Sequence, residues 1–281
     1  MTVSRGQHPV PRSMDAGLAG SGRDRAVLAL AGFGVFLALW PILVVHAAFA
    51  ISVVEGFVPL CNPYWDGCTS ISRAGRHGWA NHLFRAALLP YTVLLAFYWS
   101  LNQRWLRGLG SGGSRVMLVS GWIGALFMIL YVTFLGTEGA SYQLMRRYGI
   151  NVYFGGTFLA QVLLAVRLRG LQAQGRGASP RWVGPGLTWI AASVLAFGIF
   201  YVGVRLGLAG DRDRWENALE WAAALAMQLS IAVTAIGWRA SGLALRVECN
   251  AVAAGPDAAA SGSAGSAQRR TKLRRSSPRD A

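Results

Sequence analysis

The residues of this chain that could do chemistry are polar side chains at the edges of long apolar stretches. Arg85 and Glu220 each lie at the start of such a stretch, and Ser70, Ser72 and His82 precede Arg85. A charged or strongly polar side chain in hydrocarbon is costly unless it is paired or faces a wet cavity. We therefore interpret these residues as a candidate polar binding site, with a packing ion pair between Arg85 and Glu220 as the structural alternative.

Three further polar side chains are expected on the same face. Asn151 lies near the start of another apolar stretch, Asn217 lies three residues before Glu220 at the start of the same stretch, and Glu138 lies in a loop between stretches. The candidate outer-face site therefore comprises Ser70, Ser72, His82, Arg85, Glu138, Asn151, Asn217 and Glu220. Ser70 and His82 are the one nucleophile and base that can be placed together on the outer side of the membrane. An enzyme therefore stays an alternative, and no catalytic residue is assigned.

Sequence patterns for other kinds of site are missing. The four histidines form neither a His-Glu-x-x-His nor a His-x-x-x-His pair, so we expect no metal site. The Gly-x-Ser-x-Gly pattern of a nucleophile elbow does not occur either. No cofactor is expected.

The elements that must position these residues are membrane-spanning helices. The chain is 53% hydrophobic and 14% charged, and a bilayer is crossed by about 20 apolar helical residues. Six uncharged stretches of about that length predict six spans, and with the polar residues that open the second and the sixth these spans run at about 26–54, 80–103, 116–137, 148–166, 182–204 and 217–238. The expected fold is therefore an all-α bundle of six transmembrane helices. The first stretch is too long for the apolar region of a cleaved signal peptide.

Three regions follow from this pattern: a tail at 1–25, a membrane domain at 26–238 and a second tail at 239–281. Within the second tail, residues 251–268 are rich in Ala, Gly and Ser, which predicts disorder. Six of the residues beyond it are Lys or Arg, and they make the end of the chain polybasic.

The distribution of basic residues predicts the orientation of the bundle. With the N-terminus in the cytoplasm, 19 of the 27 Lys and Arg fall on the cytoplasmic side and seven in the loops of the other face. The positive-inside rule therefore places both termini in the cytoplasm. The net charge of +15 is then explained by topology and by anionic lipid headgroups at the tail, so lipids are the expected partners and nucleic acid is not.

Cys61 and Cys68 fall in the first outer loop, where an oxidising exterior would favour a small disulfide ring. Cys249 falls on the reducing side and is expected to be free.

Two patterns of single residue types are also informative. Seven tryptophans lie near the ends of the spans, where amphipathic rings favour the headgroup zone: Trp79, Trp99, Trp105, Trp182, Trp215, Trp221 and Trp238. Gly203 and Gly207 match a Gly-x-x-x-Gly helix contact, but Arg205 between them places this pattern at the membrane boundary.

Two short segments resemble a known family. The run from Cys68 to Ala74, CTSISRA, followed by Phe84 and Arg85, resembles the signature of the Frag/DRAM/Sfk family, and the run NALEW at 217–221 is similar to the start of that family's last helix. The family includes a post-GPI-attachment lipid-remodelling protein. The resemblance implies six spans with cytoplasmic ends, a role in lipid composition, remodelling or organisation, and a site set of Ser70, Ser72, Arg85 and Glu220.

The chain also departs from that family. Its Ala, Gly and Arg content is typical of a GC-rich bacterial source, where GPI anchors are absent, and its basic tail is not a family feature. We therefore expect a protein of the bacterial plasma (inner) membrane whose substrate the resemblance does not give.

The leading hypothesis is a protein that binds, organises or remodels membrane lipids through its outer-face polar site. The first alternative is a membrane-embedded lipid acyltransferase or hydrolase. The second is a small-molecule transporter, for which Pro41 and Pro90 interrupt spans but no convincing repeat relates the two halves.

Overall fold

The computed structural model describes residues 18–176, 179–207 and 210–245, and within these ranges it contains helices and no strands. The helices are α1 (Leu18–Val54), α2 (Ile71–Ala74), α3 (Gly78–Gly108), α4 (Arg115–Phe134), α5 (Ala140–Ala173), α6 (Val183–Arg205) and α7 (Arg212–Ala240). All except the short α2 are long and apolar enough to cross a membrane. The prediction of an all-α chain with six spans is confirmed. The predicted disorder at 251–268 and the polybasic end lie outside the described residues.

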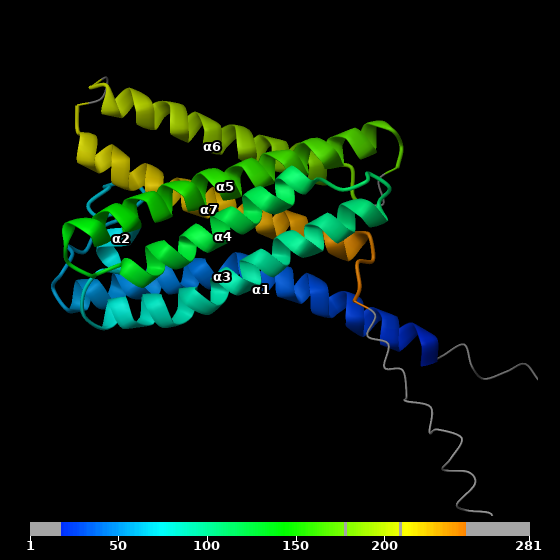
Figure 1. Ribbon diagram of the computed structural model, residues 1–281, viewed down its shortest axis with the longest axis horizontal. Helices are drawn as coiled ribbons and strands as arrows, with labels where there is room; N and C mark the ends of the chain where they lie inside the picture. Colours follow the sequence, from blue (N-terminus) through cyan, green and yellow to red (C-terminus); the bar gives the residue numbers. More distant parts are fainter. Residues whose placement is uncertain (1–17, 177–178, 208–209, 246–281) are drawn as a thin grey trace, which may run out of the picture. The chain divides into compact units, whose positions relative to one another are not determined.

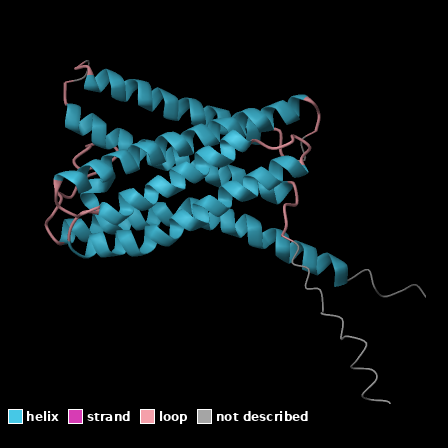
Figure 2. Cartoon of the chain, in the orientation of Figure 1, coloured by secondary structure: helices cyan, strands magenta, loops and turns pink. Residues whose placement is uncertain are grey.

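The six long helices run side by side as a closed bundle (Figure 1). Each packs against its neighbours in chain order, and contact between α1 and α7 closes the ring. The same view in Figure 2 shows loops gathered at the two ends of the bundle. The even number of spans brings the start of α1 and the end of α7 to one end, while α2 lies at the other. We refer to the end that carries α2 as the disulfide end.

Several helices are longer than the uncharged stretches that predicted them. The sequence predicts the fourth span at 148–166, but α5 runs from Ala140 to Ala173 and includes four arginines. Because backbone hydrogen bonds continue past the hydrocarbon boundary, an absence of charge marks the lipid-facing part of a helix and not its ends. The arginines at the start of α5 are thereby held on a rigid element at the disulfide end.

Four of the seven tryptophans near the span ends are buried between helices. Trp99, Trp105, Trp221 and Trp238 are at most 2% exposed. Trp238 donates from Nε1 to Asn102 Oδ1 at 3.1 Å, joining α7 to α3. A large ring with a single donor packs well in a helix interface that offers an acceptor. The position of a tryptophan near a span end does not show whether its ring faces such an interface or the headgroups.

Glycines bring α4 and α5 into close contact. A Cβ on Gly156 would lie 2.8 Å from the carbonyl oxygen of Ser120, and one on Gly124 would lie 3.1 Å from the backbone nitrogen of Thr157. Small residues allow helix backbones to approach closely in lipid, where the hydrophobic effect does not drive association. Gly207 of the expected Gly-x-x-x-Gly pattern lies beyond the end of α6 and has no neighbour within 4 Å at its Cβ position.

Glu55 stabilises the start of α3, although it precedes that helix by more than 20 residues in the chain. Its Oε1 accepts from the backbone nitrogen of Trp79 at 3.1 Å, while the residue before the helix, His77, forms no side-chain cap. We expect Glu55→Ala to lower the free energy of unfolding by ~1 kcal/mol, the usual cost of a lost N-cap. Thermal unfolding in detergent measures this loss. Glu138→Ala, which removes an exposed carboxylate, should leave the midpoint unchanged, and an equal fall in both variants would contradict this role of Glu55.

Candidate functional site

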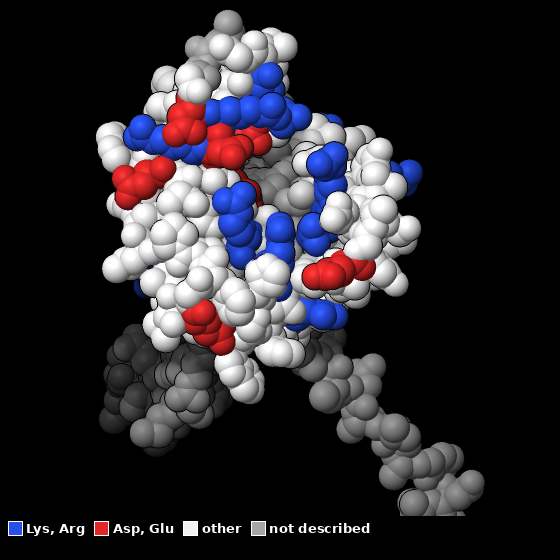
Figure 3. Space-filling view, turned by 90° about the vertical axis from the view of Figure 1, so that its left-hand side faces the viewer, with Lys and Arg blue, Asp and Glu red and all other residues white. Residues whose placement is uncertain are grey.

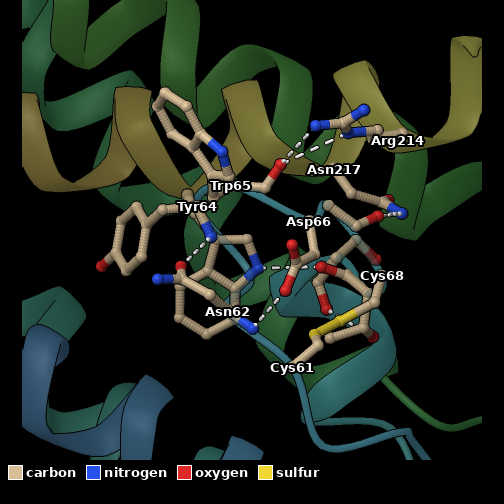
Figure 4. The surroundings of a disulfide bond; sticks show 12 residues. Cys61, Asn62, Tyr64, Trp65, Asp66, Cys68, Arg214 and Asn217 are labelled. Carbon is tan, nitrogen blue, oxygen red and sulfur yellow. Dashed lines mark hydrogen bonds between the residues drawn. A yellow bond between two sulfur atoms is a disulfide. The ribbon is translucent and has the colours of Figure 1, made fainter.

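A disulfide closes the first loop of the disulfide end. Cys61 and Cys68 are bonded, with their Cα atoms 6.5 Å apart (Figure 4). Inside the ring, Asn62 Oδ1 accepts from the backbone nitrogen of Tyr64 at 3.1 Å, and Asp66 Oδ2 accepts from that of Asn62 at 2.9 Å. The segment is therefore fixed both covalently and by its own hydrogen bonds.

Three side chains of α7 attach this ring to the bundle. Asn217 donates to the carbonyl of Gly67 at 2.8 Å, and Arg214 donates from Nε and Nη2 to that of Trp65 at 3.3 and 3.2 Å (Figure 4). Trp221 donates from Nε1 to the carbonyl of Thr69 at 2.9 Å. Asn217, one of the expected site residues, is thus buried and holds the loop in place.

Beneath the loop lies a mainly apolar cavity of about 60 Å³. Its walls come from α1, α3, α4, α5 and α7, and Tyr64 and Ile71 border it from the loop side. The apolar lining includes Ile42, Val45, Phe84, Leu88, Met128, Ile150, Phe154, Ala224 and Leu225, and the polar lining includes His46, Tyr64, Tyr131, Tyr153, Glu220 and Gln228. This is a volume for an apolar group with a few fixed polar contacts.

His46 and Tyr64 join the loop to α1. His46 Nδ1 donates to the carbonyl of Ile42 at 2.7 Å, because a carbonyl oxygen only accepts, and His46 Nε2 lies 3.1 Å from the Tyr64 hydroxyl. Burial raises the pKa of Tyr64, so its hydroxyl stays protonated. His46 therefore links α1 to the loop by hydrogen bonding.

Ser70, Ser72 and Glu220 come together at α2. Ser70 caps this short helix by accepting from the backbone nitrogen of Arg73 at 3.1 Å, and its Oγ lies 3.2 Å from that of Ser72. The backbone nitrogen of Ser72 donates to Glu220 Oε1 at 3.4 Å. Three of the predicted site residues therefore meet, and Glu220 also borders the cavity.

We call Arg73, Arg76 and Arg146 the arginine cluster. They come from α2, from the turn after it and from α5. The charges of Arg73 and Arg146 act on Arg76, and those of Arg73 and Arg76 act on Glu220. Burial, followed by the charges of Arg146 and Arg73, lowers the pKa of Arg76. Figure 3 shows basic side chains around a hollow on this end of the molecule.

Two hydrogen-bonding groups at this place lack a partner. The Tyr131 hydroxyl and Arg76 Nε are buried, and neither forms a hydrogen bond in the described structure. Tyr131 is 3% exposed and lines the cavity, and it lies within electrostatic range of Arg76, Arg146 and Glu220. A buried donor without an acceptor costs about 1–3 kcal/mol, so an acceptor supplied by a ligand would be favoured here.

The sequence did not identify these key groups. In the sequence, Arg76 and Arg146 contribute only to the count of basic residues in loops. Tyr131 lies inside an uncharged stretch, where a tyrosine is not unusual. They come close because α2, the end of α4 and the start of α5 lie at the same end of the bundle. No local sequence pattern indicates this.

The remaining expected site residues lie elsewhere. Among the described residues the ion pairs involve Glu216 with Arg205 and Arg212, so the expected pair between Arg85 and Glu220 is not formed. Arg85 follows Phe84 on α3, and Phe84 rather than Arg85 faces the cavity. The preceding residue of the helix, about 100° away around its axis, thus takes the inward position.

His82 borders a separate hollow with Glu55, Phe57, Gly78 and Trp79, so the structure does not pair it with Ser70. Asn151 and Glu138 are exposed. Across residues 30–176, 179–207 and 210–245, no group of three or more His, Cys, Asp or Glu is placed to hold a metal ion.

The fold and the cavity define a polytopic α-helical membrane protein with a polar site at one end of its bundle. No protein-family model, curated protein or solved structure matches this chain.

Proposed function

We propose that this protein binds a membrane lipid with an anionic headgroup at the disulfide end. The headgroup contacts the arginine cluster, and part of an acyl chain enters the cavity beneath it. The observation that carries this proposal is a pair of unpartnered donors: the Tyr131 hydroxyl, which lines the apolar cavity, and Arg76 Nε, whose guanidinium lies within electrostatic range of Tyr131.

The two halves of the site suit the two halves of such a ligand. Guanidinium groups donate strong, charge-assisted hydrogen bonds to phosphate oxygens. The apolar lining from α1, α3, α4 and α5 suits a hydrocarbon chain, which moves into the cavity from lipid tails that are equally apolar. A basic cluster alone or an apolar cavity alone would not indicate an amphiphilic ligand, but the two side by side do.

Orientation and lineage extend the proposal. With both termini in the cytoplasm of a bacterial cell, the disulfide end faces the exterior of the plasma membrane, where a disulfide persists. A role in lipid organisation or remodelling agrees with the resemblance to the Frag/DRAM/Sfk family. Of the residues carried over from that resemblance, Ser70, Ser72 and Glu220 adjoin the proposed site, and Arg85 does not.

An acyltransferase or hydrolase based on Ser70 and His82 has less support. Ser70 Oγ already accepts a backbone hydrogen bond as the cap of α2, and His82 borders a different hollow. A nucleophile and its base must lie within hydrogen-bonding reach or be bridged by one water.

Native mass spectrometry of the purified full chain tests lipid binding. Wild type is expected to retain an anionic phospholipid, and Arg76→Ala or Tyr131→Phe should lower that retention about ten-fold, the equivalent of one charge-assisted hydrogen bond. Arg181→Ala provides a matched control, because Arg181 is exposed at the opposite end of the bundle.

Two results would overturn the proposal. In one, wild type retains no anionic lipid above the level of a zwitterionic lipid with the same chains. In the other, all four proteins retain the lipid equally, which would assign binding to surfaces outside the arginine cluster.

A further inference from the structure

We infer that the headgroup taken by the arginine cluster is a lipid phosphomonoester, a phosphate attached to the lipid through a single ester bond. This inference rests on the proposed lipid site and adds its chemical class. Lipids of this class end in the phosphate itself, with no polyol or amine beyond it.

The first argument is charge. The charged groups that act on Arg76 are Arg73, Arg146 and Glu220, so three guanidinium groups and at most one negative charge on the carboxyl leave a local formal charge of at least +2. A phosphate monoester carries about −1.5 to −2 at pH 7. A phosphate diester carries a single negative charge and would leave one guanidinium without a counter-charge in a partly buried place.

The second argument is the number and position of donors. Arg73, Arg76 and Arg146 come from three elements, and the Tyr131 hydroxyl adds a donor from α4. A phosphomonoester presents three terminal oxygens, each of which accepts strong hydrogen bonds. Four donor-bearing residues carried by several elements match three terminal oxygens better than the two of a diester.

The third argument is the role of Glu220 at the border between headgroup and chain. Its Oε1 accepts from the backbone nitrogen of Ser72, and no arginine lies within ion-pair distance of it in the described structure. The guanidinium groups are therefore not neutralised by direct contact. Glu220 reduces the local positive charge without occupying the place of the phosphate.

A competition experiment tests the headgroup class. The full chain in zwitterionic phosphatidylcholine nanodiscs is titrated at pH 8 with phosphatidic acid or with phosphatidylglycerol of the same acyl chains. We expect phosphatidic acid to bind about ten-fold more tightly, because one more unit of charge interacts with the cluster. Arg76→Ala should remove most of this difference, whereas Arg181→Ala should preserve it together with any contribution from the basic tail.

The outcomes separate this inference from the proposed function. Equal affinity for the two lipids would overturn the phosphomonoester and leave an anionic-lipid site, and binding of neither above phosphatidylcholine would overturn both. A preference that survives in Arg76→Ala would assign it to other basic residues and also contradict the inference. Inorganic phosphate provides the final arm: if it competes at the same concentration as phosphatidic acid, the cavity contributes nothing and the ligand is not a lipid.

Discussion

Gly156→Leu is expected to destabilise the bundle by ~1–3 kcal/mol or more, the range for overpacking a close contact. Gly156 of α5 faces α4, where even a Cβ would lie 2.8 Å from the Ser120 carbonyl oxygen and 3.1 Å from the Gly124 nitrogen. Both of these atoms belong to the backbone, so the added side chain cannot be accommodated by a rotamer change and the two helices must separate.

Gly155→Leu provides the matched control for this prediction. Gly155 is the preceding residue on the same helix, it is exposed, and nothing lies within 4 Å of its Cβ position. Thermal unfolding in detergent, followed by circular dichroism, should show a clear fall in the midpoint for Gly156→Leu and little change for Gly155→Leu. Equal midpoints would mean that α4 and α5 do not pack through this face.

Separation of α4 and α5 should also reach the candidate site. Gly149 lies two turns before Gly156 on α5, and its Cβ position is 2.8 Å from the backbone nitrogen of Tyr131. The same interface therefore sets the distance between Tyr131 on α4 and Arg146 on α5. If the proposed lipid site is correct, Gly156→Leu should weaken retention of the anionic lipid, although it alters none of the groups proposed to contact the headgroup.

The second large effect is expected from loss of the disulfide. The double variant Cys61→Ser and Cys68→Ser should lower the free energy of unfolding by ~2 kcal/mol, the chain-entropy value for a short ring. The two cysteines are seven residues apart, and the ring between them carries Tyr64 to the cavity wall and Gly67 to Asn217. Lipid retention should fall with stability, because the loop covers the cavity.

Cys249→Ser serves as the control, because Cys249 lies outside the described residues and is expected to be free. Thermal unfolding with and without reductant should show a lower midpoint for reduced wild type and no effect of reductant on the double variant. A midpoint that does not respond to either treatment would show that the hydrogen bonds from Arg214, Asn217 and Trp221 hold the loop without the disulfide.

The sequence by itself determined the number of spans and their approximate positions. Hydrocarbon requires about 20 apolar helical residues for each crossing, so six long uncharged stretches leave little freedom. It also placed Cys61 and Cys68 in one short loop, and Ser70, Ser72 and Glu220 at one end of the bundle. These features depend on length, composition and the alternation of helix direction.

The tertiary structure alone decided which residues meet. Rotation of each helix about its axis turns Phe84 to the cavity instead of Arg85, buries Trp221 and Trp238 in the core, and sets Gly156 against α4. In lipid an apolar face carries no signal of where it packs, because the tails are as apolar as the side chains.

The arginine cluster shows the same limit most clearly. Arg73 and Arg76 lie about 70 residues from Arg146 in the chain, and Tyr131 lies between them inside an apolar span. Because α2, the end of α4 and the start of α5 lie together, the other three residues come within electrostatic range of Arg76. The distribution of charge in the sequence predicts on which side of the membrane these arginines lie. Only the packing of the helices shows that they belong to one candidate site.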